Sequence, residues 1–287
     1  MGTPDFAVPS LERLIQDGHS ICAVVCKEDK PSGRGMKLTF PPVKQTAIAH
    51  EIEVLQPSTL KNGTFLSELE RLNPEIIVVI AYGMILPKYI LDFPKYGCIN
   101  IHASLLPKYR GAAPIHWALI NGETVTGITT MKMDVGIDTG DMLLFKEVPI
   151  TGTTVTGELW HELSKTGAEV ISETLMKIEA NEIIPIKQDN EKATYAPMID
   201  KSMARLDFTK SAAELNNLIR GLNPYPAAFT EIDGKKLKIF SAKITNDEKN
   251  TDTLTYKCGD GLYLELSEVQ PEASRRMSCE EYMRGKR

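Results

Sequence analysis

The chain has 287 residues, of which 42% are hydrophobic and 25% charged, and its net charge at pH 7 is −5. This is the composition of an ordinary globular protein, so disordered and fibrous proteins are excluded. The longest apolar run, residues 76–82, is far shorter than the roughly 20 residues of a membrane helix. The N-terminus does not combine a basic start with an apolar stretch, as a secretory signal does. We therefore expect a cytoplasmic protein without membrane contact, with two domains or one large one.

Cysteine usage fits a reducing compartment. The five cysteines are odd in number, widely scattered and without a Cys-x-x-Cys pair (Cys22, Cys26, Cys98, Cys258 and Cys279). A disulfide framework or a zinc ribbon needs regular spacings, so neither is predicted. We expect free thiols and no metal site.

Strand-like and helix-like segments alternate along the first two-thirds of the chain. Strand patterns cover residues 21–26, 76–81, 98–103, 128–133 and 142–150, and helix patterns cover 7–17, 64–72, 113–121 and 158–180. Residues 76–81 are apolar on both faces, which is typical of a strand inside a parallel sheet. The alternation predicts a doubly wound, mostly parallel α/β domain of Rossmann-like type over residues 1–181.

The start of the chain departs from this pattern. Met1-Gly2-Thr3-Pro4 is typical of a turn that leads into a helix, and no strand pattern comes before it. In an α/β sheet such a turn usually follows the first, central strand. We therefore expect the first strand to lie upstream of Met1.

The last third of the chain has a different pattern. Residues 182–200 contain prolines and charges with little periodicity, and we interpret them as a linker. A helix pattern at 212–220 is followed by short strand patterns at 228–232, 236–244, 253–258 and 262–269. This spacing predicts a small, antiparallel, OB-like β-barrel domain over residues 201–287.

The strand at residues 98–103 carries two side chains suited to catalysis. Side chains alternate across a strand, so Asn100 and His102 share one face. Ligands of open α/β sheets bind beyond the carboxyl ends of strands, which is where His102 lies. A carboxamide can donate a hydrogen bond to a developing oxyanion, and an imidazole exchanges protons near neutral pH. The alternative is an ordinary hydrogen-bonded histidine at a strand end.

A second polar segment, residues 133–141, follows the strand at 128–133. It holds three acids and two glycines, namely Asp134, Asp138, Asp141, Gly136 and Gly140. A carboxylate from this loop next to His102 would hold the imidazole in one orientation. Calcium binding is the competing interpretation, but the spacing and the terminal Glu of an EF-hand are missing.

Several motifs in order resemble the 10-formyltetrahydrofolate-dependent formyltransferases. The residues that carry this resemblance are Asn100-x-His102-x-Ser104-Leu105-Leu106-Pro107-x-Tyr109-Arg110-Gly111 and Asp138-Thr139-Gly140. Gly2-Thr3-Pro4-Asp5-Phe6-Ala7 and Leu218-Ile219-Arg220-x-Leu222-Asn223-Pro224-x-Pro226 narrow the resemblance to the branch that acts on methionyl-tRNA. The resemblance implies transfer of a formyl group from 10-formyltetrahydrofolate to the amine of methionyl initiator tRNA, for translation initiation, by a monomer.

The resemblance also implies residue roles. Asn100, His102 and Asp138 match the catalytic residues of the family. The implied folate-binding residues are Tyr82, Gly83, Met84, Ile85, Leu86, Ser104, Leu105, Leu106 and Pro107. The implied tRNA-binding residues are Arg34 and Lys37, in the loop at 27–44, and Lys236 and Lys238, in the barrel.

The charge distribution agrees with these tRNA contacts. Residues 27–44 have a net charge of +3 and residues 200–287 of +1, whereas residues 1–199 have −6. A lysine-rich solvated surface remains the alternative for the barrel. The loop at 27–44 also contains glycines and prolines, which predict an irregular, exposed segment.

Four other functions compete with this one. A formyltransferase for a small amine, or a formyl-folate hydrolase, would share Asn100, His102 and Asp138. An RNA-binding protein without activity would have no use for these three residues. A nicotinamide oxidoreductase would need the Gly-x-Gly-x-x-Gly turn, which the chain lacks.

Overall fold

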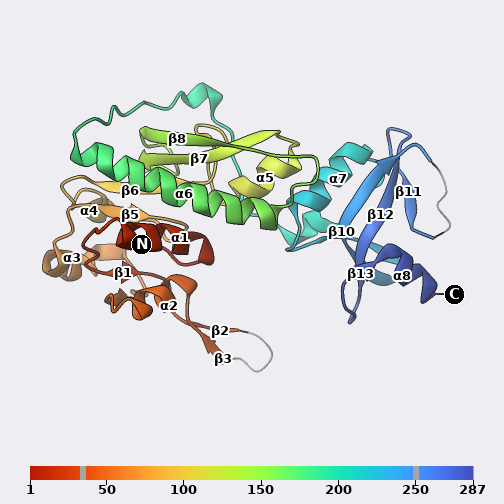
Figure 1. The fold of residues 1–287 in the computed structure, drawn as a ribbon, viewed down its shortest axis with the longest axis horizontal. Helices are drawn as coiled ribbons and strands as arrows, with labels where there is room; N and C mark the ends of the chain where they lie inside the picture. Colours follow the sequence, from red (N-terminus) through yellow and green to blue (C-terminus); the bar gives the residue numbers. More distant parts are fainter. Residues whose placement is uncertain (33–36, 248–251, 287) are drawn as a thin grey trace. The chain divides into compact units, whose positions relative to one another are not determined.

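The computed structural model describes residues 1–32, 37–247 and 252–286 (Figure 1). It divides into two compact units. Unit 1 comprises Met1–Gly111, Gly127–Val148 and Trp160–Tyr195, and unit 2 comprises Ala112–Thr126, Pro149–Leu159 and Ala196–Arg287. These units cut across the predicted boundaries at residues 181 and 201, because unit 1 continues through most of the segment interpreted as a linker.

Unit 1 holds most of the predicted α/β elements. Its helices are α1 (Val8–Gln16), α2 (Pro42–Ala49), α3 (Leu66–Leu72), α4 (Lys88–Leu91) and most of α6 (Thr156–Glu179). Its strands are β1 (Val24–Val25), β2 (Lys30–Ser32), β3 (Lys37–Thr39), β4 (Val54–Leu55), β5 (Ile77–Val79), β6 (Cys98–His102), and most of β7 (Val125–Lys132) and β8 (Met142–Pro149). The helices α2 and α4 are additions to the predicted elements.

The main sheet of unit 1 has the strand order β5-β6-β7-β8. Strands β5 and β6 are parallel, with Ile77 opposite Cys98, and β7 runs antiparallel to β6. Strands β1 and β4 form a further parallel pair. Every residue of β6 is buried, as a strand in the middle of a sheet requires. The predicted α/β fold is therefore confirmed, with parallel pairing of β1 with β4 and of β5 with β6.

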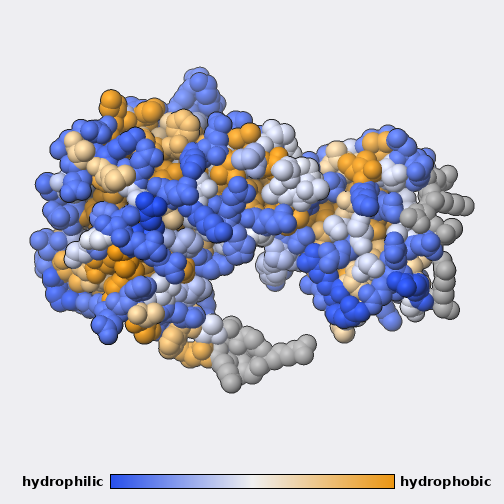
Figure 2. Space-filling model, viewed as in Figure 1, coloured by the Kyte–Doolittle hydropathy of each residue, from blue (hydrophilic) through white to orange (hydrophobic). Residues whose placement is uncertain are grey.

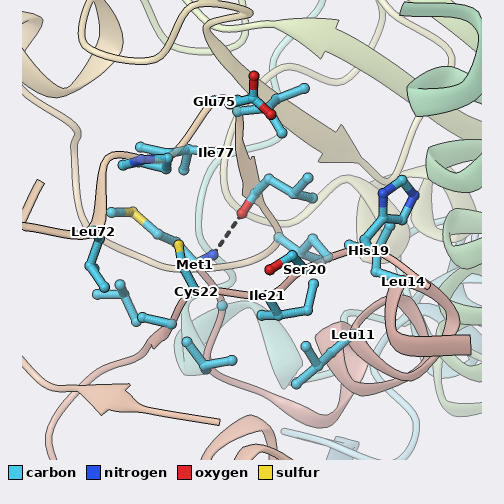
Figure 3. A pocket seen from close by; sticks show the side chains of 18 of the residues that line it. Met1, Leu11, Leu14, His19, Ser20, Ile21, Cys22, Leu72, Glu75 and Ile77 are labelled. Atoms are coloured by element: carbon cyan, nitrogen blue, oxygen red, sulfur yellow. Dashed lines mark hydrogen bonds between the residues drawn. The ribbon is translucent and has the colours of Figure 1, made fainter. Parts of the chain in front are cut away.

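Met1 and Gly2 lie between β1 and β5, where they bond to both. The amide of Gly2 donates to the carbonyl of Val25 at 2.9 Å, and the Met1 ammonium donates to the carbonyl of Val78 at 2.6 Å (Figure 3). A cavity of about 420 Å³ adjoins them, lined mostly by apolar residues, among them those of the segments that lead into β1 and β5 (Figure 3). Its lining includes none of the predicted site residues. The strand expected upstream of Met1 stays a prediction.

The segment 27–44, predicted as irregular, contains a hairpin in its described part. Strands β2 and β3 pair antiparallel, with Lys30 opposite Thr39. A cluster of three side chains joins the two ends of the hairpin: the Lys44 ammonium donates to both carboxylate oxygens of Asp29, at 2.8 and 2.7 Å, and to Gln56 Oε1 at 2.7 Å. The sequence did not predict this arrangement, because its prolines and glycines favour irregular structure and one member of the cluster, Gln56, lies outside the segment.

Unit 2 contains the predicted β domain. Its helices are α5 (Pro114–Ile120), α7 (Ala212–Gly221) and α8 (Cys279–Arg284), and its strands are β9 (Ala228–Ile232), β10 (Lys235–Thr245), β11 (Thr255–Lys257), β12 (Tyr263–Pro271) and β13 (Met277–Ser278). The strands form an antiparallel sheet of order β11-β12-β10-β9, with β13 beside β12. Within the described residues β9 and β11 do not pair, so the sheet is a half-barrel rather than a closed one.

Helix α7 covers the half-barrel. It begins with a capping box, in which Ser211 and Glu214 each bond the other's backbone amide. Its apolar residues Leu215 and Ile219 share one buried cluster with Leu237 and Ile239 of β10. Unit 2 thus has a core of its own.

Among residues 1–32, 37–247 and 252–286, none of the helices has both the length and the apolar character that crossing a membrane requires.

Candidate active site

Strand β6 places Asn100 and His102 on the same face of the sheet. Helix α6 crosses the opposite face (Figure 1), where a Cβ on Gly167 would lie 3.1 Å from the side chain of Ile101. Because side chains alternate along a strand, the face that carries Ile101 cannot carry Asn100 and His102. The packing of α6 therefore turns the two polar side chains away from the helix.

Both ring nitrogens of His102 face oxygen atoms. Nε2 lies 2.9 Å from the carbonyl oxygen of Tyr109, and Nδ1 lies 3.5 Å from Oδ2 of Asp138. A carbonyl only accepts hydrogen bonds, so Nε2 carries a hydrogen and donates it to Tyr109. The nitrogen left to exchange a proton is Nδ1, beside the carboxylate. The structure thus brings together two of the three side chains predicted as catalytic.

Asp138 lies in the polar loop between β7 and β8. Its φ of 53° is in the left-handed region, and its Oδ2 accepts a hydrogen bond from the amide of Gly111 at 2.8 Å. Asp134 is exposed and bonds within its own loop instead, where its Oδ1 accepts from Thr139 Oγ1 at 2.6 Å and from the amide of Gly136 at 3.0 Å. Of these two carboxylates, the one on Asp138 is directed at His102.

The carboxamide of Asn100 is not used by the fold in the part of the chain that the structure describes. Asn100 is 9% exposed, and within the described part of the chain its side chain makes no hydrogen bond to another residue. A buried amide without a protein partner is costly unless something else satisfies it. Its N–H groups are therefore available to a substrate oxygen.

The predicted folate loop, residues 82–86, divides into core and surface residues. Tyr82 and Leu86 belong to a buried cluster, and Met84 packs against it. Burial raises the pKa of the Tyr82 hydroxyl to about 12, and this hydroxyl has no hydrogen-bond partner among the described residues. Gly83 has a φ of +76°, and the side chain of Ile85 is 82% exposed. Contacts from this loop to a ligand would therefore come from its backbone and from Ile85.

The turn after β6 is held by one threonine. The hydroxyl of Thr129 donates to the carbonyl of Ser104 at 2.7 Å and accepts from the amide of Leu106 at 3.2 Å. Ser104 and Leu106 are buried, whereas Leu105 and Pro107 are half-buried. Two of the four predicted folate residues in this turn therefore serve its own packing.

The predicted tRNA-binding residues are spread over both units. Arg34 lies outside the described residues, and for Lys37 the structure describes the backbone, in β3, without its side chain. Lys236 and Lys238 lie on β10 in unit 2, and the Lys236 ammonium sits 3.6 Å from the centre of the Phe229 ring. Figure 2 shows a hydrophilic surface over β13 and α8 of unit 2.

The structure also contains a hydrogen-bond network around the backbone of Asp138 that the sequence did not predict. Gln188 bonds the buried guanidinium of Arg110 with its oxygen and the carbonyls of Asp138 and Gly140 with its nitrogen. Gln188 lies in the segment interpreted as a linker. The one sign in the sequence that this segment is ordered is the short apolar pattern before Gln188, at positions 183, 184 and 186.

Comparison with known proteins decides the family. The formyl transferase family matches residues 1–175, and the formyl transferase C-terminal domain matches residues 198–287. The chain is 52% identical to methionyl-tRNA formyltransferase of Caldanaerobacter subterraneus and 50% identical to that of Acetivibrio thermocellus, covering 99% of this chain and 95% of each relative. The chain belongs to the methionyl-tRNA formyltransferase family. The resemblance inferred from the motifs is therefore confirmed.

Solved structures agree on the fold. The N-formyltransferase from Helicobacter canadensis, in complex with folinic acid and dTDP-3-aminofucose, superimposes with a TM-score of 0.70 over 94% of this chain and 97% of its own, at 22% identity. Methionyl-tRNA formyltransferase from Clostridium thermocellum has a TM-score of 0.54 over 79% of this chain and 91% of its own, at 21% identity. The formyltransferase family thus shares this architecture.

Proposed function

We propose that the chain transfers the formyl group of 10-formyltetrahydrofolate to the amino group of methionyl initiator tRNA, acting as a monomer in translation initiation. The observation that carries the proposal is the 3.5 Å approach of Asp138 to His102, on a strand that also holds Asn100. The name shared by relatives of about half-identical sequence supports the choice of substrates.

The arrangement suits attack of an amine on a formyl carbon. As the new N–C bond forms, negative charge develops on the formyl oxygen, and the carboxamide of Asn100 donates to it. His102 takes the proton of the attacking amine at Nδ1, where Asp138 stabilises it, and returns it to the departing folate nitrogen. The C–N bond to the folate then breaks. No covalent intermediate on the protein is required.

The residues around the loop at 82–86 fit a folate co-substrate. The glycine with positive φ and the exposed Ile85 offer backbone groups and an apolar surface, which is what a flat heteroaromatic ring requires. Tyr82 and Leu86 contribute by holding this loop to the core. The polar groups of the ring would bond to the loop backbone.

The proposed tRNA contacts rest on positively charged side chains. Lys236 is exposed and Lys238 half-buried on β10, so both ammonium groups reach solvent on the side opposite Leu237 and Ile239. Ammonium groups in such positions bind phosphates without reading sequence. Arg34 and Lys37 extend this proposal to the hairpin at 30–39.

A formylation assay tests the proposal. The purified chain is incubated with radiolabelled 10-formyltetrahydrofolate and methionyl initiator tRNA, with methionyl elongator tRNA as control. We expect label on the initiator tRNA. Consumption of the formyl donor without an acceptor would indicate a hydrolase, and transfer only to an added amino sugar nucleotide would indicate a small-amine formyltransferase. Either outcome would refute the proposed substrate.

A further inference from the structure

The segment after α6 is fastened at two places to the loops that flank the candidate active site. Ile186 exchanges two backbone hydrogen bonds with Met142 at the start of β8, of 2.8 and 2.9 Å. Further along, Thr194 accepts hydrogen bonds from the amides of Tyr109 and Arg110, both of 2.9 Å. Residues 186–194 therefore run past both the loop of Asp138 and the loop whose carbonyl bonds His102.

Between these two places lies Gln188, whose amide is fully engaged. Its Oε1 accepts from Arg110 Nε at 3.0 Å and Nη2 at 2.7 Å. Its Nε2 donates to the carbonyl of Asp138 at 2.8 Å and to that of Gly140 at 2.7 Å. A guanidinium only donates and a carbonyl only accepts, so the amide fits in one orientation.

Arg110 makes this orientation obligatory. It is 2% exposed, and Nη2 also donates to Asn190 Oδ1 at 2.9 Å. A buried cation is costly without acceptors, so Arg110 keeps the oxygen of Gln188 on its side. The nitrogen of Gln188 therefore stays hydrogen-bonded to the carbonyls of the Asp138 loop.

We infer that Gln188 is a positioning residue of the formyl-transfer reaction, which sets the backbone of Asp138 so that its carboxylate faces His102. The inference rests on the proposed function. Asp138 has a φ of 53°, in the left-handed region, where a residue with a side chain is less stable than in the ordinary regions. Gln188 from one side and the amide of Gly111 from the other hold it in this conformation.

Gln188→Glu separates positioning from folding. The glutamate has nearly the same shape and still pairs with Arg110, but it no longer donates to the two carbonyls, so the loss falls on the loop of Asp138. We expect a melting temperature lowered by only a few degrees, a kcat lowered about 10²-fold, as for a misplaced catalytic group, and nearly unchanged KM values for both substrates. Gln16→Glu, which makes the same change on the exposed face of α1, serves as the control. If Gln188→Glu melts early, the kcat of wild type and variant is measured at a temperature well below the variant's melting temperature.

A double-mutant cycle with Asp138→Asn completes the test. If Gln188 acts through Asp138, the second substitution adds little to the first, whereas independent effects multiply. The side-chain resonances of His102, in protein labelled at its five histidines, should move in Gln188→Glu and stay in Gln16→Glu. A wild-type kcat or multiplicative losses overturn the inference. Absence of formyl transfer by the wild-type chain refutes the proposed function, and unmoved His102 resonances then refute the positioning role as well.

Discussion

Oδ2 of Asp138 lies 3.5 Å from Nδ1 of His102, and the same oxygen accepts the amide hydrogen of Gly111 at 2.8 Å. The carboxylate is therefore held by the backbone while it faces the imidazole. We therefore expect the negative charge of Asp138 to be needed for catalysis.

Asp138→Asn should lower kcat by roughly 10²–10⁴-fold, because a neutral amide cannot stabilise a proton taken up at His102 Nδ1. Steady-state formylation kinetics measure the loss. Asp134→Asn is the matched control, since Asp134 bonds within its own loop. Equal losses in the two variants would contradict the role of Asp138.

Asn100→Ala should lower kcat by roughly 10²–10³-fold, the usual effect of removing one oxyanion donor, with the KM for tRNA nearly unchanged. Asn100→Asp keeps the shape but cannot donate when ionised, so it should be similarly impaired. Near-normal turnover in either variant would remove Asn100 from the mechanism.

Lys44→Met should reduce stability in a pH-dependent way. The hydrogen bond from Lys44, followed by that from Gln56, lowers the pKa of Asp29 below its ordinary value. A carboxyl whose pKa is depressed by folding stabilises the fold above its ordinary pKa of about 3.9, and this stabilisation is lost as the pH falls through the folded value. The difference in melting temperature between wild type and variant should therefore be larger at pH 7 than at pH 3.

The control for this experiment is Arg71→Met. Arg71 pairs with Glu53 and Glu68, but its side chain is 48% exposed, against 13% for Lys44. Exposed ion pairs contribute little to stability. A larger loss at pH 7 for Arg71→Met than for Lys44→Met would contradict the importance of the Lys44 cluster.

Gly140→Ala should destabilise the protein by about 1–3 kcal/mol and reduce activity. A Cβ at this position would collide with the carbonyl oxygen of Lys132, so the loop that carries Asp138 would have to move. Gly152 has open space around it, and Gly152→Ala should change the free energy of unfolding by less than about 0.5 kcal/mol. Chemical denaturation measures both values.

Lys236→Ala should weaken the use of tRNA without changing that of the folate. If Lys236 contacts one phosphate, the slope of log KM for tRNA against log salt should fall by about 0.7–0.9. Lys165→Ala removes the same charge from an exposed position on α6 and should leave the slope unchanged. Identical slopes for all three proteins would refute the contact.

Much of the fold and part of the site could be predicted from the sequence. The strand with Asn100 and His102 follows from alternation along six residues, and Asp138 stands out among the acids of a short loop. The network of Gln188 could not be predicted, because its partners lie 48–78 residues away along the chain and a glutamine carries no periodic or ionic signal. The hairpin of β2 and β3 could not be predicted either, because the prolines and glycines in and around it favour irregular structure and mask the pairing of Lys44 with Asp29 and Gln56.

The last stretch of unit 1 ends at Tyr195, well past the end of α6. A chimera that exchanges the C-terminal part between members of this family should therefore be joined after Tyr195. A chimera joined at residue 181 would keep Asn100, His102 and Asp138 from one protein but would take Gln188, which bonds the backbone of Asp138, from the other.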